Sequence, residues 1–274
     1  MSNILINGSY QECINVTDRG LQYGDGVFET MAVRKGKIPL WDKHWQRLVL
    51  GCTKLSITCP DIMLIKKDIT ALCNNANNEK LVIKLIVTRG NGQRGYRYER
   101  KLPSARILSL HDWTDHPEQY QTNGVCVRYC ETTLSENKKL AGIKHLNRLE
   151  QVLARNEWDD DFQEGLMLNT KGHVIDGTMS NIFLVKDNKL FTPELSLAGV
   201  AGVMRQTIIE LAQTLSVIVI EKNILQQDIE QADEVFLTNS LFGIWPVKVL
   251  EKISFRSAGK ITQQLQIKLT QLGS

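Results

Sequence analysis

The sequence predicts a mixed α/β or α+β fold made of two domains. Short runs rich in β-branched residues alternate with segments in which apolar residues recur every three or four positions. Turn signals such as Asn7-Gly8 separate several of the short runs, which is typical of antiparallel hairpins. A chain of 274 residues can form two modest domains, and the polar stretch at 113–123 separates two apolar parts. We therefore predict a smaller domain at 1–112, a linker at 113–123 and a larger domain at 124–274.

The first part of the chain is expected to combine strands with two helices. Apolar residues at helical spacing predict the helices, namely Trp45, Leu48, Cys52 and Leu55, followed by Ile62, Ile65, Ile69 and Leu72. Strands are expected at 4–7, 9–14, 27–34, 37–40, 81–88 and 105–110.

The second part is expected to contain more strands than helices. The strands are predicted at 125–130, 165–169, 173–176, 181–186, 189–192, 217–221, 234–238 and 243–249. The helices are predicted near 203–215, 225–232 and 258–271.

One further helix is expected to begin at Asn147. Asn147 and Glu150 have the spacing of a capping box, in which each side chain satisfies a backbone N–H group of the first turn. Leu146, Leu149 and Leu153 fall at helical spacing, so we expect them to face the interior.

Lys144 lies just before this expected helix, where its amine could point into a cleft. Burial of a lysine amine lowers its pKa and makes it nucleophilic enough for Schiff-base chemistry. Position alone does not exclude a solvated surface lysine, which is the ordinary case. The assignment of a function to Lys144 therefore depends on the residues around it in the sequence.

The composition excludes several classes of function. Apolar content is 42% and charged content 23%, and the net charge of +3 is too small to favour a nucleic acid or a membrane surface as partner. The N-terminus lacks a secretory pattern and no apolar run is long enough to span a membrane, so we expect a cytoplasmic protein. The six cysteines form no CxxC pair and the five histidines show no metal-ligand spacing, so reduced cysteines and no metal are expected.

The segment Gly90–Gly95 formally matches the dinucleotide fingerprint GxGxxG. That fingerprint needs a helix immediately afterwards, whose N-terminus meets the pyrophosphate. The following residues, 96–103, show no helical period and end at Pro103. A nucleotide site is therefore not expected, and the residues alone allow a glycine-rich hairpin or a substrate-binding loop.

The segment from Gly142 to Arg155, Gly-Ile-Lys-His-Leu-Asn-Arg-Leu-Glu-Gln-Val-Leu-Ala-Arg, resembles the lysine motif of the fold type IV pyridoxal-phosphate enzymes. This family includes aminodeoxychorismate lyases and the D-amino acid and branched-chain aminotransferases. The His-Leu-Asn-Arg-Leu-Glu continuation is more similar to the lyases, and the resemblance extends over nearly the whole chain. It implies a smaller N-terminal α/β domain, a larger C-terminal pseudo-barrel domain carrying the Schiff-base lysine, Lys144, and a homodimer.

The resemblance also implies how pyridoxal 5′-phosphate would be bound. Asp176 would hold the proton on the pyridine nitrogen, although the family usually has glutamate at this position. Arg47 would meet the phosphate, together with backbone N–H groups of a helix start at Val203 and Met204 and with an amide and a hydroxyl of a strand end at Asn239 and Ser240. Taken singly, each of these phosphate residues has an ordinary structural explanation, and only the joint match favours a site.

Four further residues match the substrate site of the family. Arg94 and Tyr96 occupy the places of loop residues that can hold the substrate carboxylate, sometimes by reaching into the neighbouring subunit, and arginine suits bidentate carboxylate recognition. Phe28 and Thr30 lie in a segment similar to the N-terminal active-site strand, where Thr30 would donate or relay a proton near the substrate's enolpyruvyl group. Thr30 could equally be an ordinary strand residue.

These expectations imply a lyase that converts 4-amino-4-deoxychorismate to 4-aminobenzoate and pyruvate for folate biosynthesis, with Lys144 as general base. Two alternatives stay open. One is amino-group transfer with the same cofactor, as in the D-amino acid or branched-chain aminotransferases. The other is a cofactor-free protein that binds a small molecule on the same scaffold.

Overall fold

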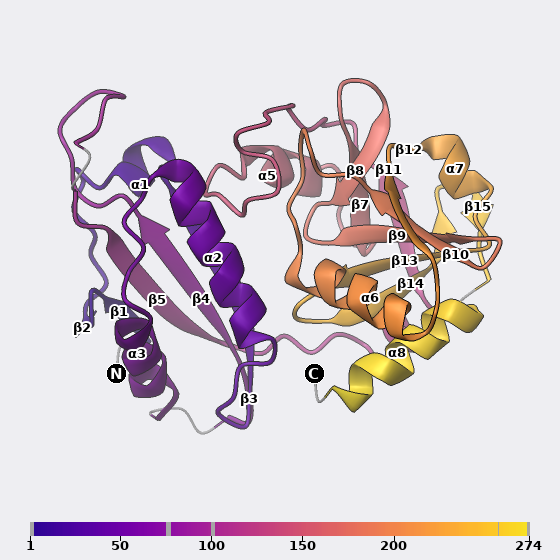
Figure 1. Cartoon of the computed structure of the whole chain (residues 1–274), viewed down its shortest axis with the longest axis horizontal. Coiled ribbons are helices and arrows are strands. Elements are labelled where there is room, and N and C mark those ends of the chain that lie inside the picture. Colours follow the sequence, from indigo (N-terminus) through magenta and orange to yellow (C-terminus); the bar gives the residue numbers. More distant parts are fainter. Residues whose placement is uncertain (1–2, 75–77, 100–101, 257, 273–274) are drawn as a thin grey trace. The chain divides into compact units, whose positions relative to one another are not determined.

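The computed structural model describes residues 3–74, 78–99, 102–256 and 258–272 and divides into two compact units. Figure 1 shows the course of the chain through both. The first unit comprises the chain up to Thr114 together with Ile143–Asn147, and the second comprises Asp115–Gly142 and the chain from Arg148 onwards. The short segment around Lys144 thus groups with the first unit, whereas the sequence suggested that it belongs to the second. The domain boundaries predicted from the sequence stay a proposal.

The first unit is an antiparallel sheet with two long helices on one face (Figure 1). The strand order is β2-β1-β5-β4-β3, so that β3 is an edge strand. The strands are β1 (Ile4–Ile6), β2 (Ser9–Tyr10), β3 (Gly26–Arg34), β4 (Lys80–Thr88) and β5 (Ala105–Asp112). The helices are α1 (Arg19–Tyr23), α2 (Trp41–Leu55) and α3 (Ile62–Asn74).

Residue alternation explains how this sheet meets its helices. In β4 every second side chain is fully buried, namely Leu81, Ile83, Leu85 and Val87. These side chains pack in one core with Leu48 and Cys52 of α2 and with Ile65 and Leu72 of α3. A strand with one face against helices and a period of two is what the apolar pattern predicted.

Most elements predicted for this unit are confirmed, with one error, one omission and one strand, expected at 9–14, that covers only Ser9–Tyr10. The strand expected at 37–40 is wrong, because only an isolated bridge joins Arg34 to Lys37 and Leu40, with φ of 56°, leads into α2. The omitted element is α1, which begins at Asp18 and ends at Gly24 in the left-handed region, with φ of 64°.

The second unit is built around a ten-stranded mixed sheet. The path is β11-β10-β9-β13-β14-β6-β7-β8-β12, and β15 pairs with β14. The strands are β6 (Val125–Tyr129), β7 (Glu164–Leu168), β8 (His173–Gly177), β9 (Asn181–Lys186), β10 (Lys189–Pro193), β11 (Val219–Lys222), β12 (Ile224–Leu225), β13 (Glu234–Asn239), β14 (Gly243–Leu250) and β15 (Ile253–Ser254). The central strands β9 and β13 are buried at nearly every residue, which is why they read as continuous apolar runs.

Five helices accompany this sheet in the described part of the second unit. They are α4 (Gln119–Thr122), α5 (Leu149–Arg155), α6 (Val203–Thr214), α7 (Gln226–Glu230) and α8 (Lys260–Gln271). The three longer predicted helices and all eight predicted strands of this half are confirmed within a few residues, while α4, β12 and β15 were not predicted. No helix in the described ranges has both the length and the hydropathy to cross a bilayer.

The helix expected at Asn147 differs from the prediction in two ways. It is α5, which begins at Leu149, and the expected capping box is absent because the Asn147 amide donates to the Gly24 carbonyl. Glu150 instead accepts the backbone N–H of Ser135. The inward apolar face is also wrong: Leu149 and Leu153 are 69% and 55% exposed, since α5 buries only Ala154.

Candidate active site

Lys144 is held by backbone pairing along the edge of β3. The Lys144 carbonyl accepts the N–H of Phe28 at 2.9 Å, and the N–H of Leu146 donates to the Gly26 carbonyl at 3.0 Å. A Cβ on Gly26 would meet the Val87 carbonyl at 2.5 Å, so only glycine allows this close approach. Lys144 therefore lies in a segment whose backbone is paired with a strand rather than in a free loop, which suits a residue that must hold a reacting group in place.

The Lys144 amine lies over the ring of Phe28, 4.5 Å from the ring centroid. Phe28 and Thr30 share one face of β3 because side chains alternate along a strand, and both are half-buried. The opposite face carries Val27 and Met31, which pack in the core with α2. The structure thus brings Lys144 and Phe28 together, with Thr30 next on the same face, as the resemblance implied.

Arg47 is fixed by an ion pair that the sequence did not reveal. Its Nε and Nη2 atoms donate to the two carboxylate oxygens of Glu29 at 2.7 and 2.6 Å, and His44 Nδ1 lies 2.6 Å from the same carboxylate. Burial alone would raise the pKa of Glu29. The charges and hydrogen bonds of Arg47 and His44 outweigh burial and lower this pKa to about 2. Glu29 is thus ionised and orients Arg47, whose role at a phosphate stays a prediction.

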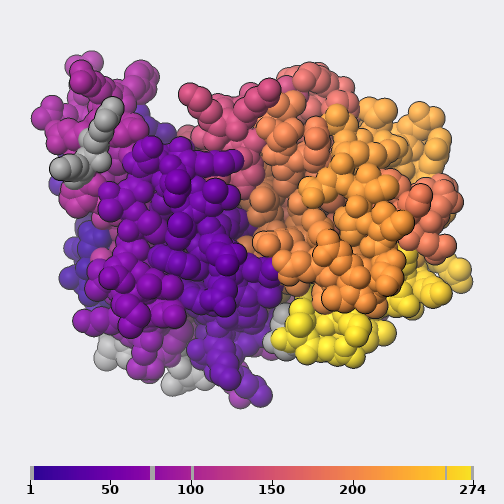
Figure 2. Space-filling view, in the orientation of Figure 1, coloured from indigo at the N-terminus to yellow at the C-terminus, as the bar shows by residue number. Residues whose placement is uncertain are grey.

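Arg94 and Tyr96 lie on the exposed loop that follows β4 and projects from the surface of the first unit, in magenta at the upper left of Figure 2. No helix forms in residues 90–99, in agreement with the expectation against a dinucleotide site. A cavity of about 910 Å³ opens beside this loop, and its lining includes Arg19, Arg94, Arg97 and Tyr98. The guanidinium groups of Arg94 and Arg97 fit a carboxylate ligand in this cavity, although the assignment of Arg94 and Tyr96 to substrate stays a prediction.

Asp176, in the second unit, is a buried carboxyl group with an unusual pKa. Its Oδ1 atom accepts from the Asn181 amide at 2.6 Å and its Oδ2 atom accepts from the Val200 N–H at 2.7 Å. Burial raises the pKa of Asp176 to about 7, even though these hydrogen bonds and the charges of Arg205 and Arg148 lower it. A carboxyl group with a pKa near 7 can share a proton with a neighbouring basic nitrogen.

The start of α6 is closely connected to Asp176. The helix begins after Gly202 and has no side-chain cap, while Val203 and Met204 of its first turn are buried. A Cβ on Gly202 would collide with the side-chain oxygen of Asn181, the residue that also donates to Asp176 and to the Val200 carbonyl. Free N–H groups at a helix start favour a phosphate, and Asp176 suits a pyridine nitrogen. The second unit therefore contains groups that fit both ends of pyridoxal 5′-phosphate.

Asn239 is the last residue of β13, and Ser240 begins the turn to β14. The Asn239 side-chain oxygen accepts the N–H groups of Leu241 and Phe242, both at 2.9 Å, and its amide donates to Met179 at 3.3 Å. The Asn239 side chain therefore shapes the turn, a role of asparagine that is common after strands. Phosphate binding by Asn239 and Ser240 stays a prediction.

Three sets of polar interactions were missed in the sequence. Glu29 is a charged residue inside an apolar strand pattern, and that interruption was the signal for a buried partner. Asn181 similarly opens a run of buried apolar residues. No sequence pattern indicated the ion pairs of Arg19 and Arg89 with Asp25, because the spacing of these residues along the chain follows no local period.

Comparison with known proteins identifies the family. The model of the amino-transferase class IV family matches residues 26–250. This chain belongs to the class IV family. The fold type IV architecture expected from the resemblance is thereby confirmed.

Individual class IV proteins match over almost the whole chain. Aminodeoxychorismate lyase of Vibrio harveyi is 39% identical over 266 residues, which cover 95% of this chain and 97% of that protein. The crystal structure of 4-amino-4-deoxychorismate lyase from Pseudomonas aeruginosa has a TM-score of 0.93 and 43% identity, with 98% of each chain covered. A putative branched-chain-amino-acid aminotransferase of Methanocaldococcus jannaschii is 30% identical, covering 97% of this chain and 94% of that protein.

Proposed function

We propose that this chain is an aminodeoxychorismate lyase, which converts 4-amino-4-deoxychorismate to 4-aminobenzoate and pyruvate in folate biosynthesis. The observation that carries the proposal is the likeness, over nearly the full length, to two proteins that bear this name, at 39% and 43% identity. The putative aminotransferase relative is less similar, at 30% identity.

Pyridoxal 5′-phosphate is the cofactor of this reaction. Lys144 would hold it through the side-chain amine, Asp176 would meet the pyridine nitrogen, and the start of α6 at Val203 and Met204 would bind the phosphate. Arg47, Asn239 and Ser240 are the further phosphate residues that the family resemblance implies. When bound, the cofactor supplies an electron-poor ring that accepts the charge released at the substrate.

The residues of the chain would move and hold the protons. The amine of Lys144 would remove the proton from the substrate carbon that bears nitrogen, acting as general base. Asp176 would keep a proton at the pyridine nitrogen, and Thr30 would donate or relay a proton near the enolpyruvyl oxygen. The carbon–oxygen bond to the enolpyruvyl group then breaks, the ring becomes aromatic and enolpyruvate takes up a proton to give pyruvate. Arg94, Tyr96 and Phe28 would hold the substrate during these steps.

Release of pyruvate without an acceptor tests the reaction type. Purified protein loaded with pyridoxal 5′-phosphate is expected to form pyruvate and 4-aminobenzoate in equal amounts from 4-amino-4-deoxychorismate alone. Addition of 2-oxoglutarate should not change the rate. A requirement for the keto acid would instead show an aminotransferase, and a colourless protein without a borohydride-trapped adduct on Lys144 would indicate a binding protein.

We also propose that the protein is a cytoplasmic homodimer. Support for the dimer comes from α5, whose residues Leu149, Val152 and Leu153 form an exposed apolar stripe at positions i, i+3 and i+4. Support for the cytoplasm comes from the six cysteines, all free.

Light scattering of the purified holoenzyme tests the dimer. The expected mass is twice that of the 31.1 kDa chain, and Leu153→Glu is expected to shift the population towards monomer because a charge would enter an apolar interface. Lys268→Glu on the last turn of α8 is the matched control and should leave the mass unchanged. A wild-type mass equal to one chain would contradict the proposal.

A further inference from the structure

Arg19 is a buried arginine whose side chain holds the loop that carries Arg94. Its Nη1 atom donates to the Gly95 carbonyl at 2.8 Å and its Nη2 atom donates to the Tyr96 carbonyl at 3.3 Å. Only 3% of the Arg19 side chain is exposed. The two carbonyls belong to the two residues that directly follow Arg94, so Arg19 fixes the backbone there.

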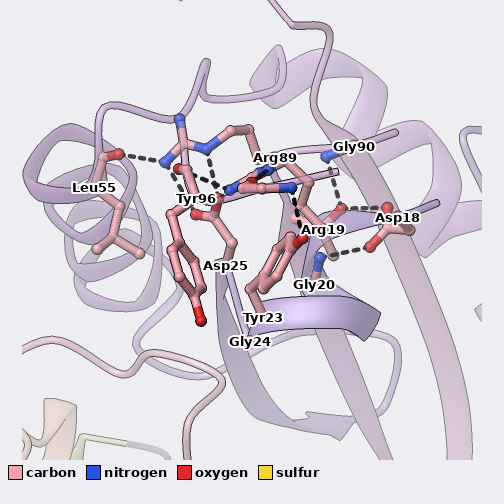
Figure 3. Close-up of polar contacts among 12 residues, drawn as sticks. Asp18, Arg19, Gly20, Tyr23, Gly24, Asp25, Leu55, Arg89, Gly90 and Tyr96 are labelled. Carbon is pink, nitrogen blue, oxygen red and sulfur yellow. Dashed lines mark hydrogen bonds and ion pairs between the residues drawn. The ribbon is translucent and has the colours of Figure 1, made fainter. Parts of the chain in front are cut away.

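Two other groups complete this attachment, as Figure 3 shows. The Tyr23 hydroxyl accepts the N–H of Gly95 at 3.0 Å, and the Tyr23 ring meets the Tyr96 ring edge-on, with 5.7 Å between centroids. Asp25 accepts from Arg19 Nε at 3.0 Å and from Arg89 Nε at 2.7 Å, so one carboxylate orients two arginines. Arg89 lies at the end of β4, where the loop begins.

The base of the loop is tied to the same part of the chain. Arg19 N donates to the Gly90 carbonyl at 2.9 Å, and Gly92 N donates to the Thr17 carbonyl at 3.1 Å. Both ends of the segment 90–96 are therefore bonded to residues 17–25 rather than to solvent. In the described part of the chain Arg94 itself makes no hydrogen bond or ion pair, so its guanidinium remains available to a ligand.

The segment that anchors the loop continues directly into the strand that holds Lys144. Gly24 accepts from the Asn147 amide at 3.2 Å, Gly26 accepts from Leu146 N, and Phe28 N donates to Lys144. A continuous run from Arg19 to Phe28 thus bonds to the Arg94 loop at one end and to the lysine segment at the other. Hydrogen-bonded backbone on both sides makes this run a rigid connection.

We propose that Arg19 and Tyr23 are positioning residues for the substrate: they set the place of Arg94 by fixing its loop to the Arg19–Phe28 run. The proposal rests on the function proposed above, in which Arg94 binds a substrate carboxylate. The substrate carries two carboxylates, because each of its two products has one. Neither Arg19 nor Tyr23 is required to touch the substrate, since each acts through the loop backbone.

The test compares Tyr23→Phe and Arg19→Lys with the wild-type holoenzyme. Tyr23→Phe removes only the oxygen that accepts from Gly95, while Arg19→Lys keeps a charge beside Asp25 but cannot reach both carbonyls. Arg106→Lys is the matched control, because Arg106 forms an ion pair of 2.7 Å with Asp68 in the same unit and does not contact the loop. KM and kcat are measured by pyruvate release, cofactor binding by visible absorbance, and loop order by the rate of trypsin cleavage after Arg94 and Arg97.

The expected result is a rise in KM of about fivefold for Tyr23→Phe and about tenfold or more for Arg19→Lys, as loss of one and of two or more hydrogen bonds implies. kcat should stay within about twofold, the absorbance should be unchanged and trypsin cleavage should accelerate by a similar factor. Arg106→Lys should change none of these.

Unchanged KM and unchanged cleavage in both loop variants would overturn the proposal. Loss of cofactor absorbance together with lower kcat would also overturn it, since the two residues would then support the whole unit. A wild-type enzyme that releases no pyruvate would refute the proposed function instead, and the cleavage rates would still show whether the loop is anchored.

Discussion

Lys144→Ala is expected to lower the turnover of 4-amino-4-deoxychorismate by at least about 10³-fold, because general-base catalysis at the carbon bearing nitrogen depends on this amine. The position of Lys144 supports this expectation. Its backbone is hydrogen-bonded to β3 and its amine lies 4.5 Å from the centroid of the Phe28 ring. The measurement is the initial rate of pyruvate release, with borohydride reduction and peptide mapping to locate the trapped cofactor.

Lys84→Ala is the matched control for this experiment. The Lys84 amine lies 5.6 Å from the centroid of the same ring, on the neighbouring strand, and no role in the reaction is assigned to it. Lys84→Ala should retain turnover within a few-fold and should keep the adduct on Lys144. Full activity of Lys144→Ala would show that Lys144 is not the general base. A borohydride-trapped adduct on Lys84 would show that Lys84, rather than Lys144, binds the cofactor.

The sequence predicted the regular elements well because their burial is periodic. The strand β4 alternates buried and partly exposed residues, and α2 buries Leu48 and Cys52 at a spacing of four. The short elements were missed for the opposite reason: α1 has five residues and no apolar stripe, and only its Asp18 cap and Gly24 end mark it. The strand wrongly predicted at 37–40 had apolar residues but leads directly into a helix.

At the start of α5, long-range hydrogen bonds replace the capping box that the local sequence predicts. Asn147 and Glu150 have capping-box spacing, yet Asn147 bonds to Gly24, which lies far away along the chain, and Glu150 bonds to Ser135. Glu150 still accepts a backbone N–H group, but from outside the helix, and Asn147 donates to a carbonyl instead of accepting an N–H group. No rule based on spacing alone could choose between these partners.

Sequence patterns are limited in the same way when they are used to predict the partners of charged groups at the site. Lys144 and Phe28 could be placed together from the resemblance of their segments, and the structure confirms that they meet. The anchor at Arg19 depends on carbonyl groups of a loop more than seventy residues later, which have no side-chain signature. Backbone acceptors of this kind can be found only from the fold.

Asp176→Asn is expected to lower kcat by about 10²-fold, because a neutral amide cannot keep the proton on the pyridine nitrogen that makes the ring an effective electron acceptor. Asp176→Glu keeps a carboxylate at this position and should stay within about tenfold of the wild type. Pyruvate release at saturating substrate is the measurement. Equal kcat values for the wild type and Asp176→Asn would remove Asp176 from the mechanism.

The pKa of Asp176 gives a second, independent result in the cofactor-free protein. Burial raises this pKa from an ordinary value of 3.8 to about 7 in the folded state. Between about pH 4 and pH 7 the folded protein then holds a proton that the unfolded chain has released, so the free energy of unfolding should fall as the pH rises through this range. The difference is on the order of a few kcal/mol and should be absent in Asp176→Asn, which has no proton to lose.

Urea unfolding of the wild type and Asp176→Asn at several pH values measures this difference directly. Parallel pH profiles would show that the Asp176 carboxyl is ionised throughout the range and that burial does not control its pKa. A stricter test compares the cofactor-free wild type with wild type saturated with pyridoxal 5′-phosphate. A positively charged ring nitrogen beside Asp176 would favour the ionised carboxylate, so the loss of stability between pH 4 and 7 should shrink in the loaded wild type. If the loaded and cofactor-free proteins lost stability equally, Asp176 would not be the partner of that nitrogen.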